Sequence, residues 1–209
     1  MGNESGKAIH RLRPLMAGRG IDIGCGPCPV EGADPWDWAQ GDAQYMDGVE
    51  DLTYDWVFSA HCLEHMRDPH TAIQNWWRIL KVGGYLIVLV PDEDLYEQCV
   101  WPSKFNSDHK RTFTCGKHKS WSPVSINCTD LLRHLPGHHL ISLTLEDNGY
   151  DYERTGWDQT TGGAEAAVQF VVKKQAMPQY VGTLEVTLGG VKNVSTGDTT
   201  PEHGPENSS

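Results

Sequence analysis

Short apolar runs alternate along this chain with a segment whose apolar residues recur at helical spacing. Residues 85–90 (YLIVLV) are apolar at every position, which is typical of a strand in a parallel sheet covered on both faces. Residues 20–23 and 54–60 (YDWVFSA) predict two more buried strands. Before 85–90, Asp68-Pro69 predicts a helix start, because the carboxylate caps free N–H groups and proline needs none. Strand, helix and strand in this order predict a right-handed βαβ unit.

The helix of this unit is expected to end at Gly83-Gly84. Before the unit, residues 5–17 predict a short amphipathic helix that is broken near Pro14, whereas residues 24–42 predict no helix. The apolar residues of the helix that share one face are Ile73, Trp76, Trp77 and Leu80.

Beyond the unit, residues 91–121 carry no apolar period, and so long a loop inside a compact domain is usually functional. Ser122-Pro123 repeats the pattern of a capped helix start. Residues 140–145 and 166–172 are expected to pair as a final hairpin-like couple of strands across a long loop.

We expect one α/β domain over residues 1–174. Two irregular segments, about 93–121 and 147–165, are expected to form a lid over the substrate. Residues 175–209 turn to Gly, Thr, Pro, Ser and Glu, and from about residue 193 they predict a disordered tail.

The composition excludes some classes of protein. A formal net charge of −11 disfavours a nucleic-acid partner, because an acidic surface repels phosphate backbones. No apolar run approaches the roughly 20 residues of a membrane span, and the first residues lack the apolar stretch of a secretory signal. We therefore expect a cytoplasmic protein with no membrane partner. The six cysteines are then expected to be free thiols.

A glycine-rich loop, Asp22-Ile23-Gly24-Cys25-Gly26, directly follows the first predicted strand. Glycines there permit a tight turn and let a ligand touch the backbone. In doubly wound sheets this position, at the carboxyl end of a strand, is where ligands bind. A dinucleotide site would need a third glycine at position 29, where the chain has Pro29.

The tetrapeptide Cys25-Gly26-Pro27-Cys28 supports a second interpretation of the loop, as a thiol–disulfide redox site. A reactive thiolate in that setting is stabilised at a helix N-terminus. Here Pro29, Gly32 and Pro35 interrupt whatever follows. The redox interpretation stays as an alternative.

Taken together, four motifs in order resemble the class I S-adenosylmethionine-dependent methyltransferases, of the broad type 11 group. They are IDIGCG (21–26), GDAQ (41–44), YDWVFSAHCLEH (54–65) and RILKVGGYLIVLVPD (78–92). The resemblance implies a Rossmann-like, doubly wound, mostly parallel sheet with a C-terminal antiparallel hairpin. It also implies S-adenosyl-L-methionine as cofactor and S-adenosyl-L-homocysteine as product.

The resemblance assigns cofactor-binding roles to several residues. It implies that Asp37, or alternatively Asp34, accepts hydrogen bonds from the ribose hydroxyls. Asp42 and the backbone of Ala43 are expected at the adenine ring. The remaining predicted cofactor residues are Asp22, Gly24, Cys25 and Gly26 at the methionine end, Trp38 as an aromatic neighbour, and Ser59 and Ala60 beside the sulfonium.

The chain departs from the family pattern in one place. Between Gly24 and Gly41 it is too short for the usual two helices and two strands, since a parallel crossover needs roughly a dozen residues or more. We expect a sheet trimmed after the first strand, with one strand and two helices missing or vestigial.

Methyl transfer is an in-line displacement, and an oxygen acceptor of high pKa also needs a base, which is most often histidine. His109, in the irregular segment after the last cofactor strand, is the first candidate for a catalytic residue. His61 and His65 come next, because they flank the expected methyl site.

A zinc site formed by Cys115-x-x-His118 and Cys25-x-x-Cys28 has allowed spacings. The second pair, however, lies in the predicted cofactor loop, so we expect no metal ligands.

The sequence thus predicts methyl transfer to an oxygen of a small molecule, a sugar or a glycan end, by a monomer or homodimer. The alternatives are a thiol–disulfide or dinucleotide oxidoreductase and a non-catalytic S-adenosylmethionine-binding module.

Overall fold

The computed structural model describes residues 4–177, 186–187 and 190–191. The chain divides into two compact units, residues 1–176 and residues 177–209. In the second unit, β9 (Val186–Thr187) and β10 (Gly190–Val191) pair antiparallel. The predicted disorder from residue 193 falls outside the described residues. No helix in the described part of the chain is long and apolar enough to cross a membrane.

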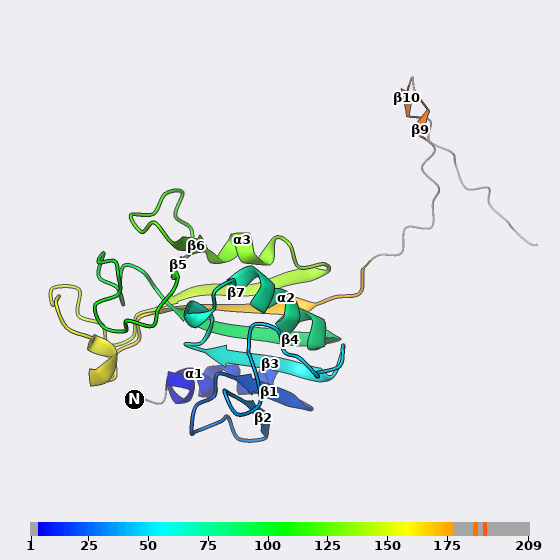
Figure 1. Ribbon diagram of the computed structural model, residues 1–209, viewed down its shortest axis with the longest axis horizontal. Coiled ribbons are helices and arrows are strands. Elements are labelled where there is room, and N and C mark those ends of the chain that lie inside the picture. The colour runs from blue at the N-terminus through cyan, green and yellow to red at the C-terminus, as the bar shows by residue number, and fades with distance from the viewer. Residues whose placement is uncertain (1–3, 178–185, 188–189, 192–209) are drawn as a thin grey trace, which may run out of the picture. The chain divides into compact units, whose positions relative to one another are not determined.

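The first unit is built on a six-stranded sheet of order β2-β1-β3-β4-β8-β7 (Figure 1). The pairs β1–β2, β1–β3 and β3–β4 are parallel, and β4–β8 and β7–β8 are antiparallel. This confirms the mostly parallel sheet with a C-terminal antiparallel couple. The strands are β1 (Gly20–Ile23), β2 (Ala33–Trp36), β3 (Tyr54–Ala60), β4 (Leu80–Pro91), β7 (His138–Glu146) and β8 (Ala167–Lys174).

Helices cover both faces of the sheet. On one face, α2 (Pro69–Ile79) and α3 (Cys128–Leu132) bury Trp76 and Leu131 in the larger core cluster. On the other face, α1 (Glu4–Leu12), which the 3₁₀ turn η1 (Arg13–Leu15) continues, buries Ala8 and Leu12 against Trp56. The chain is therefore a layered α/β domain, as the alternation of apolar patterns predicted.

The β3–α2–β4 unit forms as predicted at its start and differs at its end. Asp68 Oδ1 accepts hydrogen bonds from the N–H groups of His70 and Thr71, which caps α2. The helix, however, passes directly into β4 at Leu80, so Gly83-Gly84 lies inside the strand. A Cβ on Gly84 would lie 2.5 Å from the Asp55 carbonyl oxygen. Close packing of β3 and β4 therefore explains this glycine, rather than helix termination.

The trimmed region lies where the sequence predicted it. Residues 24–32 and 37–53, all of them described, contain turns and bends but no helix. A strand that the pattern did not predict, β2, lies at the sheet's edge. Its sequence, Ala-Asp-Pro-Trp, includes Pro35, which an edge strand tolerates because only one side of it must donate to a neighbour.

The predicted helix start at Ser122-Pro123 is wrong. Residues 125–127 form β6 (Ser125–Asn127), which pairs parallel with β5 (Thr112–Thr114), a strand inside the predicted loop. The helix begins at Cys128, where Asn127 Oδ1 accepts a hydrogen bond from the Thr129 N–H. Pairing with β5 keeps the intervening backbone extended, so the later cap starts the helix.

Candidate functional site

The predicted cofactor residues meet at one edge of the sheet because the parallel strands β2, β1 and β3 end together there. Ile23 is in register with Trp36 on one side and with Ser59 on the other. The residues that follow this row are Gly24, Asp37 and Ala60. Three motifs far apart in the sequence are thus brought to one carboxyl edge, which is where doubly wound sheets bind ligands.

Asp37 and the glycine loop are joined directly. The N–H of Gly26 donates to Asp37 Oδ2 at 2.7 Å, and the N–H of Trp38 donates to Asp37 Oδ1 at 2.7 Å. The N–H of Gly24 donates to the carbonyl of Trp36 at 2.8 Å. The acidic residue after β2 therefore sets the shape of the loop after β1.

The two glycines of the loop have different roles. Gly24 has φ +76°, and a Cβ on it would lie 2.5 Å from Cys62 Cβ, so packing inside the protein requires this glycine. Gly26 has φ +57°, and a Cβ there would meet no atom within 4 Å. Gly26 is therefore the glycine that leaves backbone open for a ligand.

Asp22 is fully buried beneath the loop. Its Oδ2 accepts a hydrogen bond from the Val30 N–H at 2.8 Å, which closes the loop, while its Oδ1 has no hydrogen-bond partner among the described residues. Burial raises the pKa of Asp22 to about 6. A buried, unpartnered carboxylate oxygen favours a cationic ligand at this place.

The Cys25–Cys28 pair lacks the features of a redox site. Both cysteines are free thiols, with Cys25 buried and Cys28 exposed. Burial raises the pKa of the Cys25 thiol, which is the opposite of the lowered pKa of a reactive cysteine. The residues that follow, 26–32, contain no helix whose N-terminus could stabilise a thiolate.

The adenine-side candidates lie in the turn after β2, tied to α2. The carbonyl of Ala43 accepts a hydrogen bond from Trp76 Nε1 at 2.8 Å, and Asp42 Oδ1 accepts one from the Gln44 N–H. Trp38 is 91% exposed, which is unusual for so large an apolar side chain. The alternative acid Asp34 is engaged in an ion pair with Arg19, with 2.8 Å between Asp34 Oδ2 and Arg19 Nη2. Because this ion pair occupies Asp34, Asp37 is the better candidate for the carboxylate that accepts hydrogen bonds from the ribose.

Ser59 and Ala60 end β3, and the chain then turns sharply. Ser59 Oγ donates to the carbonyl of Ile23 at 2.9 Å, which ties β3 to β1. His61 follows with φ +54°, and the 3₁₀ turn η2 (Leu63–His65) comes next. This turn places His61 and His65 at the carboxyl edge of the sheet.

All three candidate histidines converge on Glu64, a residue that the sequence analysis missed. The distances to Glu64 Oε1 are 3.7 Å from His61 Nδ1, 3.8 Å from His65 Nε2 and 3.9 Å from His109 Nε2. The carbonyl of Glu64 accepts the N–H of Lys110 at 2.8 Å, which fastens the distant histidine segment to η2. We call His61, Glu64, His65 and His109 the Glu64 cluster.

Two further carboxylates contact the Nδ1 atoms of His65 and His109, on the side of each ring away from Glu64. His109 Nδ1 lies 2.6 Å from Glu97 Oε1, and both side chains are buried. His65 Nδ1 lies 2.9 Å from Asp108 Oδ2. The only sequence signal for this arrangement was the acid between the two early histidines, in His-x-x-Glu-His.

A cavity of about 210 Å³ adjoins this cluster through Glu97. It lies between the two predicted lid segments, whose contacts include Gln98 Nε2 donating to the Trp157 carbonyl and Tyr150 Oη donating to the Leu95 carbonyl. Figure 1 shows both segments, green and yellow, at the end of the sheet where β3 points. Other residues lining the cavity are Val100, Lys104, Phe105, Thr155 and Gly156.

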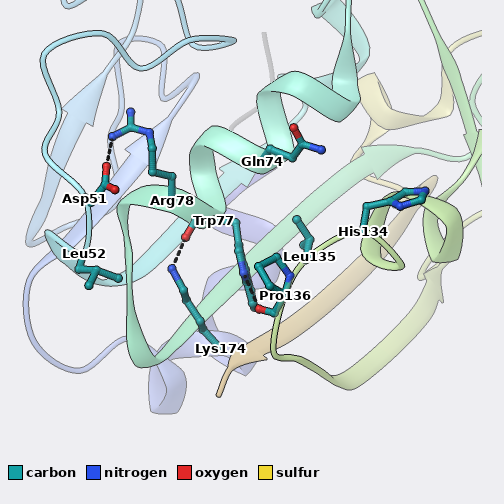
Figure 2. A pocket seen from close by; sticks show the side chains of 9 residues that line it. All are labelled: Asp51, Leu52, Gln74, Trp77, Arg78, His134, Leu135, Pro136 and Lys174. Carbon is teal, nitrogen blue, oxygen red and sulfur yellow. Dashed lines mark hydrogen bonds and ion pairs between the residues drawn. The ribbon is translucent and has the colours of Figure 1, made fainter. Parts of the chain in front are cut away.

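A larger cavity, of about 370 Å³, lies beside the C-terminal half of α2 (Figure 2). Its lining also includes residues 51–52 before β3, residues 134–136 after α3 and Lys174 at the end of β8. Its charged groups already have partners: Arg78 pairs with Asp51, and Lys174 Nζ donates to the carbonyls of Trp77 and Leu80. It lies away from the carboxyl edge, so we assign no catalytic role to it.

The comparisons with known proteins concern the family and the fold. Residues 28–88 match the family model of a methyltransferase domain, which covers β2, β3, α2 and most of β4. The matched range begins just after the glycine loop. No curated protein matches the chain in sequence.

Several solved structures share the fold. A Thermotoga maritima protein described as an S-adenosylmethionine-dependent methyltransferase, "possible histamine N-methyltransferase", is 20% identical, with a TM-score of 0.53 over 83% of this chain and 90% of that one. An S-adenosylmethionine-dependent methyltransferase of Archaeoglobus fulgidus is 14% identical, with a TM-score of 0.52 over 83% and 95%. The YcgJ protein of Bacillus subtilis is 12% identical, with a TM-score of 0.52 over 82% and 99%. At these identities the likeness establishes the fold.

Proposed function

We propose that the chain is a class I S-adenosylmethionine-dependent methyltransferase that methylates an oxygen of a small-molecule or glycan acceptor. The match of residues 28–88 to a methyltransferase-domain model and the shared fold support this proposal. The observation that carries the proposal is the meeting, at one carboxyl edge, of the glycine loop, Asp37 and the Glu64 cluster. The glycine loop follows β1, and the turn that carries His61 and His65 follows the neighbouring parallel strand β3.

The residues at this edge fit S-adenosylmethionine. Its ribose hydroxyls are donors, and the Asp37 oxygens keep lone pairs beyond the backbone groups they already accept. Its methionine end is cationic, which suits the unpartnered Asp22 Oδ1, and the open side of Gly26 leaves it room. Its adenine needs a flat apolar neighbour, which the exposed Trp38 can supply near Asp42 and Ala43. In this proposal Gly24, Cys25, Ser59 and Ala60 complete the contact.

The bound cofactor supplies a methyl group on a positively charged sulfur. In transfer the sulfur–carbon bond breaks, a carbon–oxygen bond forms in line with it, and the acceptor oxygen loses its proton. We propose that the cavity between the lid segments positions the acceptor, which supplies much of the acceleration. His109, with His61 and His65, then acts on the acceptor's proton, and its imidazole is held for that by Glu97.

The acceptor class is proposed from size and charge. A cavity of about 210 Å³ accommodates a small molecule or the end of a glycan. The net charge of −11 disfavours a polyanionic acceptor such as nucleic acid. All six cysteines, each within the described residues, are free thiols, which suits the reducing cytoplasm that we propose as the site of action of a monomer or homodimer.

Titration calorimetry with S-adenosylhomocysteine, followed by turnover on a panel of acceptors, tests the proposal. We expect one binding site per chain and methyl transfer to a hydroxylated acceptor. Absence of cofactor binding would refute the proposed function. Binding without turnover on any acceptor would instead favour the non-catalytic module. Replacing both Cys25 and Cys28 by serine should leave turnover measurable, whereas a redox enzyme would lose all activity.

A further inference from the structure

We propose that Glu64, His65 and His109 form a binding site for a divalent transition-metal cation of the zinc class. One ligand atom from each of these residues lies within 4.8 Å of the other two, and no other such group of three occurs among the described His, Cys, Asp and Glu residues. This site differs from the cysteine pairs considered in the sequence analysis, and it replaces the expectation of no metal ligand.

The distances suit ligands around a shared ion better than hydrogen bonds. His65 Nε2 and His109 Nε2 lie 3.8 and 3.9 Å from Glu64 Oε1, beyond hydrogen-bond range. Ligands on a tetrahedral zinc ion, with bonds of about 2.0–2.2 Å, lie roughly 3.3–3.5 Å apart. A contraction of a few tenths of an ångström would bring each histidine nitrogen to that spacing from Glu64 Oε1.

The Nδ1 atoms of His65 and His109 each have a carboxylate partner, as the second nitrogen of a metal-bound histidine commonly does. A metal-bound imidazole commonly donates its other N–H to a carboxylate, which fixes its tautomer and orientation. Here Glu97 lies 2.6 Å from His109 Nδ1 and Asp108 lies 2.9 Å from His65 Nδ1, so each ring turns Nε2 toward Glu64. Two separate carboxylates thus impose the same orientation on two histidines.

Glu64 itself is the second, independent indication of a ligand. Its side chain is 1% exposed, and neither of its carboxylate oxygens accepts a hydrogen bond from the described residues. A buried carboxylate without hydrogen bonds is costly, and a cation beside it removes that cost. Glu97, which contacts His109, has a further unpartnered buried oxygen, Oε2, beside the Glu64 cluster.

The ligand set selects the class of cation. Two imidazole nitrogens and one carboxylate suit zinc and similar transition metals, whereas calcium and magnesium prefer oxygen alone. Three protein ligands leave a fourth position open, as in catalytic zinc sites. If the proposed function holds, that position would face the acceptor, and a cation there lowers the pKa of an acceptor hydroxyl. With His65 and His109 bound to the cation, His61 is the candidate histidine that would take the proton. Metal binding itself does not depend on the proposed function.

The test is metal binding by the full chain after treatment with a chelator. Titration with Zn²⁺ by calorimetry, and with Co²⁺ by absorption, should show one equivalent per chain, with cobalt bands of a nitrogen–oxygen site. Glu64→Gln and His109→Gln should each weaken binding more than about 100-fold. Glu97→Gln should weaken it about 10- to 100-fold, as for a residue that orients a ligand. His118→Gln is the matched control, because His118 is an exposed histidine outside the cluster. This variant should bind the metal as the wild type does.

Glu64→Gln also separates a metal site from a structural role. The amide removes the buried charge, so the metal-free variant should melt at a higher temperature than the metal-free wild type, and added Zn²⁺ should raise only the wild-type melting temperature. If Glu64→Gln does not fold, His65→Gln takes its place, since His65 is more exposed. Failure of the wild type to bind either metal, or undiminished binding in both Glu64→Gln and His109→Gln, would overturn the proposal. Calorimetry with S-adenosylhomocysteine on the same samples reports separately on the proposed function.

Discussion

The two sides of the carboxyl edge are held together in different ways. On the proposed cofactor side, residues 22–43, carboxylates accept hydrogen bonds from backbone groups of the same short stretch: Asp22 from Val30 and Asp37 from Gly26. On the proposed acceptor side, residues 60–65 and 93–121, two carboxylates face imidazoles more than 40 residues away in the sequence: Asp108 faces His65, and Glu64 faces His109. The first arrangement shapes a backbone surface for a ligand. The second gathers buried charge and imidazole at one point.

The difference explains how a trimmed domain can keep the proposed cofactor site. The hydrogen bonds of Asp22 and Asp37 define the loop in the place of the helices missing from residues 24–32 and 37–53. The acceptor side, by contrast, depends on the long irregular segment after β4, which reaches back to η2 through the Glu64 carbonyl. Substitutions on the cofactor side should therefore change the affinity for the cofactor, whereas substitutions on the acceptor side should change kcat.

The largest effect is expected on the acceptor side. His109→Gln should lower kcat by about 10²- to 10⁴-fold, because the group that acts on the acceptor's proton is lost. Its affinity for S-adenosylhomocysteine, measured by calorimetry, should stay within about twofold. His134→Gln, at an exposed histidine of the cavity in Figure 2, is the control for losing an imidazole. A variant that lost cofactor affinity as much as kcat would break the division between the two sides.

On the cofactor side, Gly24→Ala should cost about 2–4 kcal/mol of unfolding free energy, because a Cβ at φ +76° would overlap Cys62. Gly26→Ala should cost only about 1 kcal/mol, since its Cβ would meet no atom of the protein. It should instead weaken cofactor binding. Urea unfolding measures the loss of stability in both variants, and calorimetry measures their affinity for S-adenosylhomocysteine. Equal stability losses would show that the two glycines share one role.

The buried Asp22 should make stability depend on pH. Its pKa of about 6 in the folded chain lies above the ordinary value of 3.8, so between these values the folded state keeps a proton that the unfolded chain loses. Stability should therefore fall as pH rises through this window, by at most roughly 3 kcal/mol for this residue. Asp22→Asn should lack this part of the decline, as urea unfolding at pH 4.5 and pH 7 would show.

Asp92→Asn is the matched comparison for Asp22→Asn. Burial also raises the pKa of Asp92 to about 6, but this residue lies at the end of β4, outside the cofactor loop. Both variants should flatten the pH dependence, whereas only Asp22→Asn should alter cofactor affinity. Loss of affinity in both would contradict a specific role for Asp22.

The smallest expected effect is on cofactor affinity, and it distinguishes Asp37 from Asp34 as the residue that binds the ribose. Asp37→Ala should weaken binding of S-adenosylhomocysteine about 10- to 100-fold, because hydrogen bonds from the ribose to a carboxylate are lost. Asp34→Ala removes only an exposed ion pair with Arg19 and should leave affinity within about twofold. Calorimetry decides between them, and a larger loss in Asp34→Ala would move the ribose site to that residue.

Much of the fold could be predicted because local patterns and sheet topology agreed. The cap at Asp68, the uniformly apolar β4 and the glycine loop after β1 each depend on neighbours in the sequence. The errors arose where pairing with distant chain overrode a local signal. β5 keeps residues 125–127 extended past an apparent helix start, and β2 forms beside β1 despite its proline.

By itself, the sequence determined the β3–α2–β4 unit, the position of the glycine loop and the three histidines as candidates. Only the tertiary structure decided that these histidines surround Glu64, and that Glu97 and Asp108 orient two of them. The physical reason is range. Capping and apolar periodicity act over a few residues. The Glu64 cluster instead depends on a long irregular segment that folds back to the end of β3. Because the charges there are buried, each needs a partner, and the partners come from distant parts of the chain.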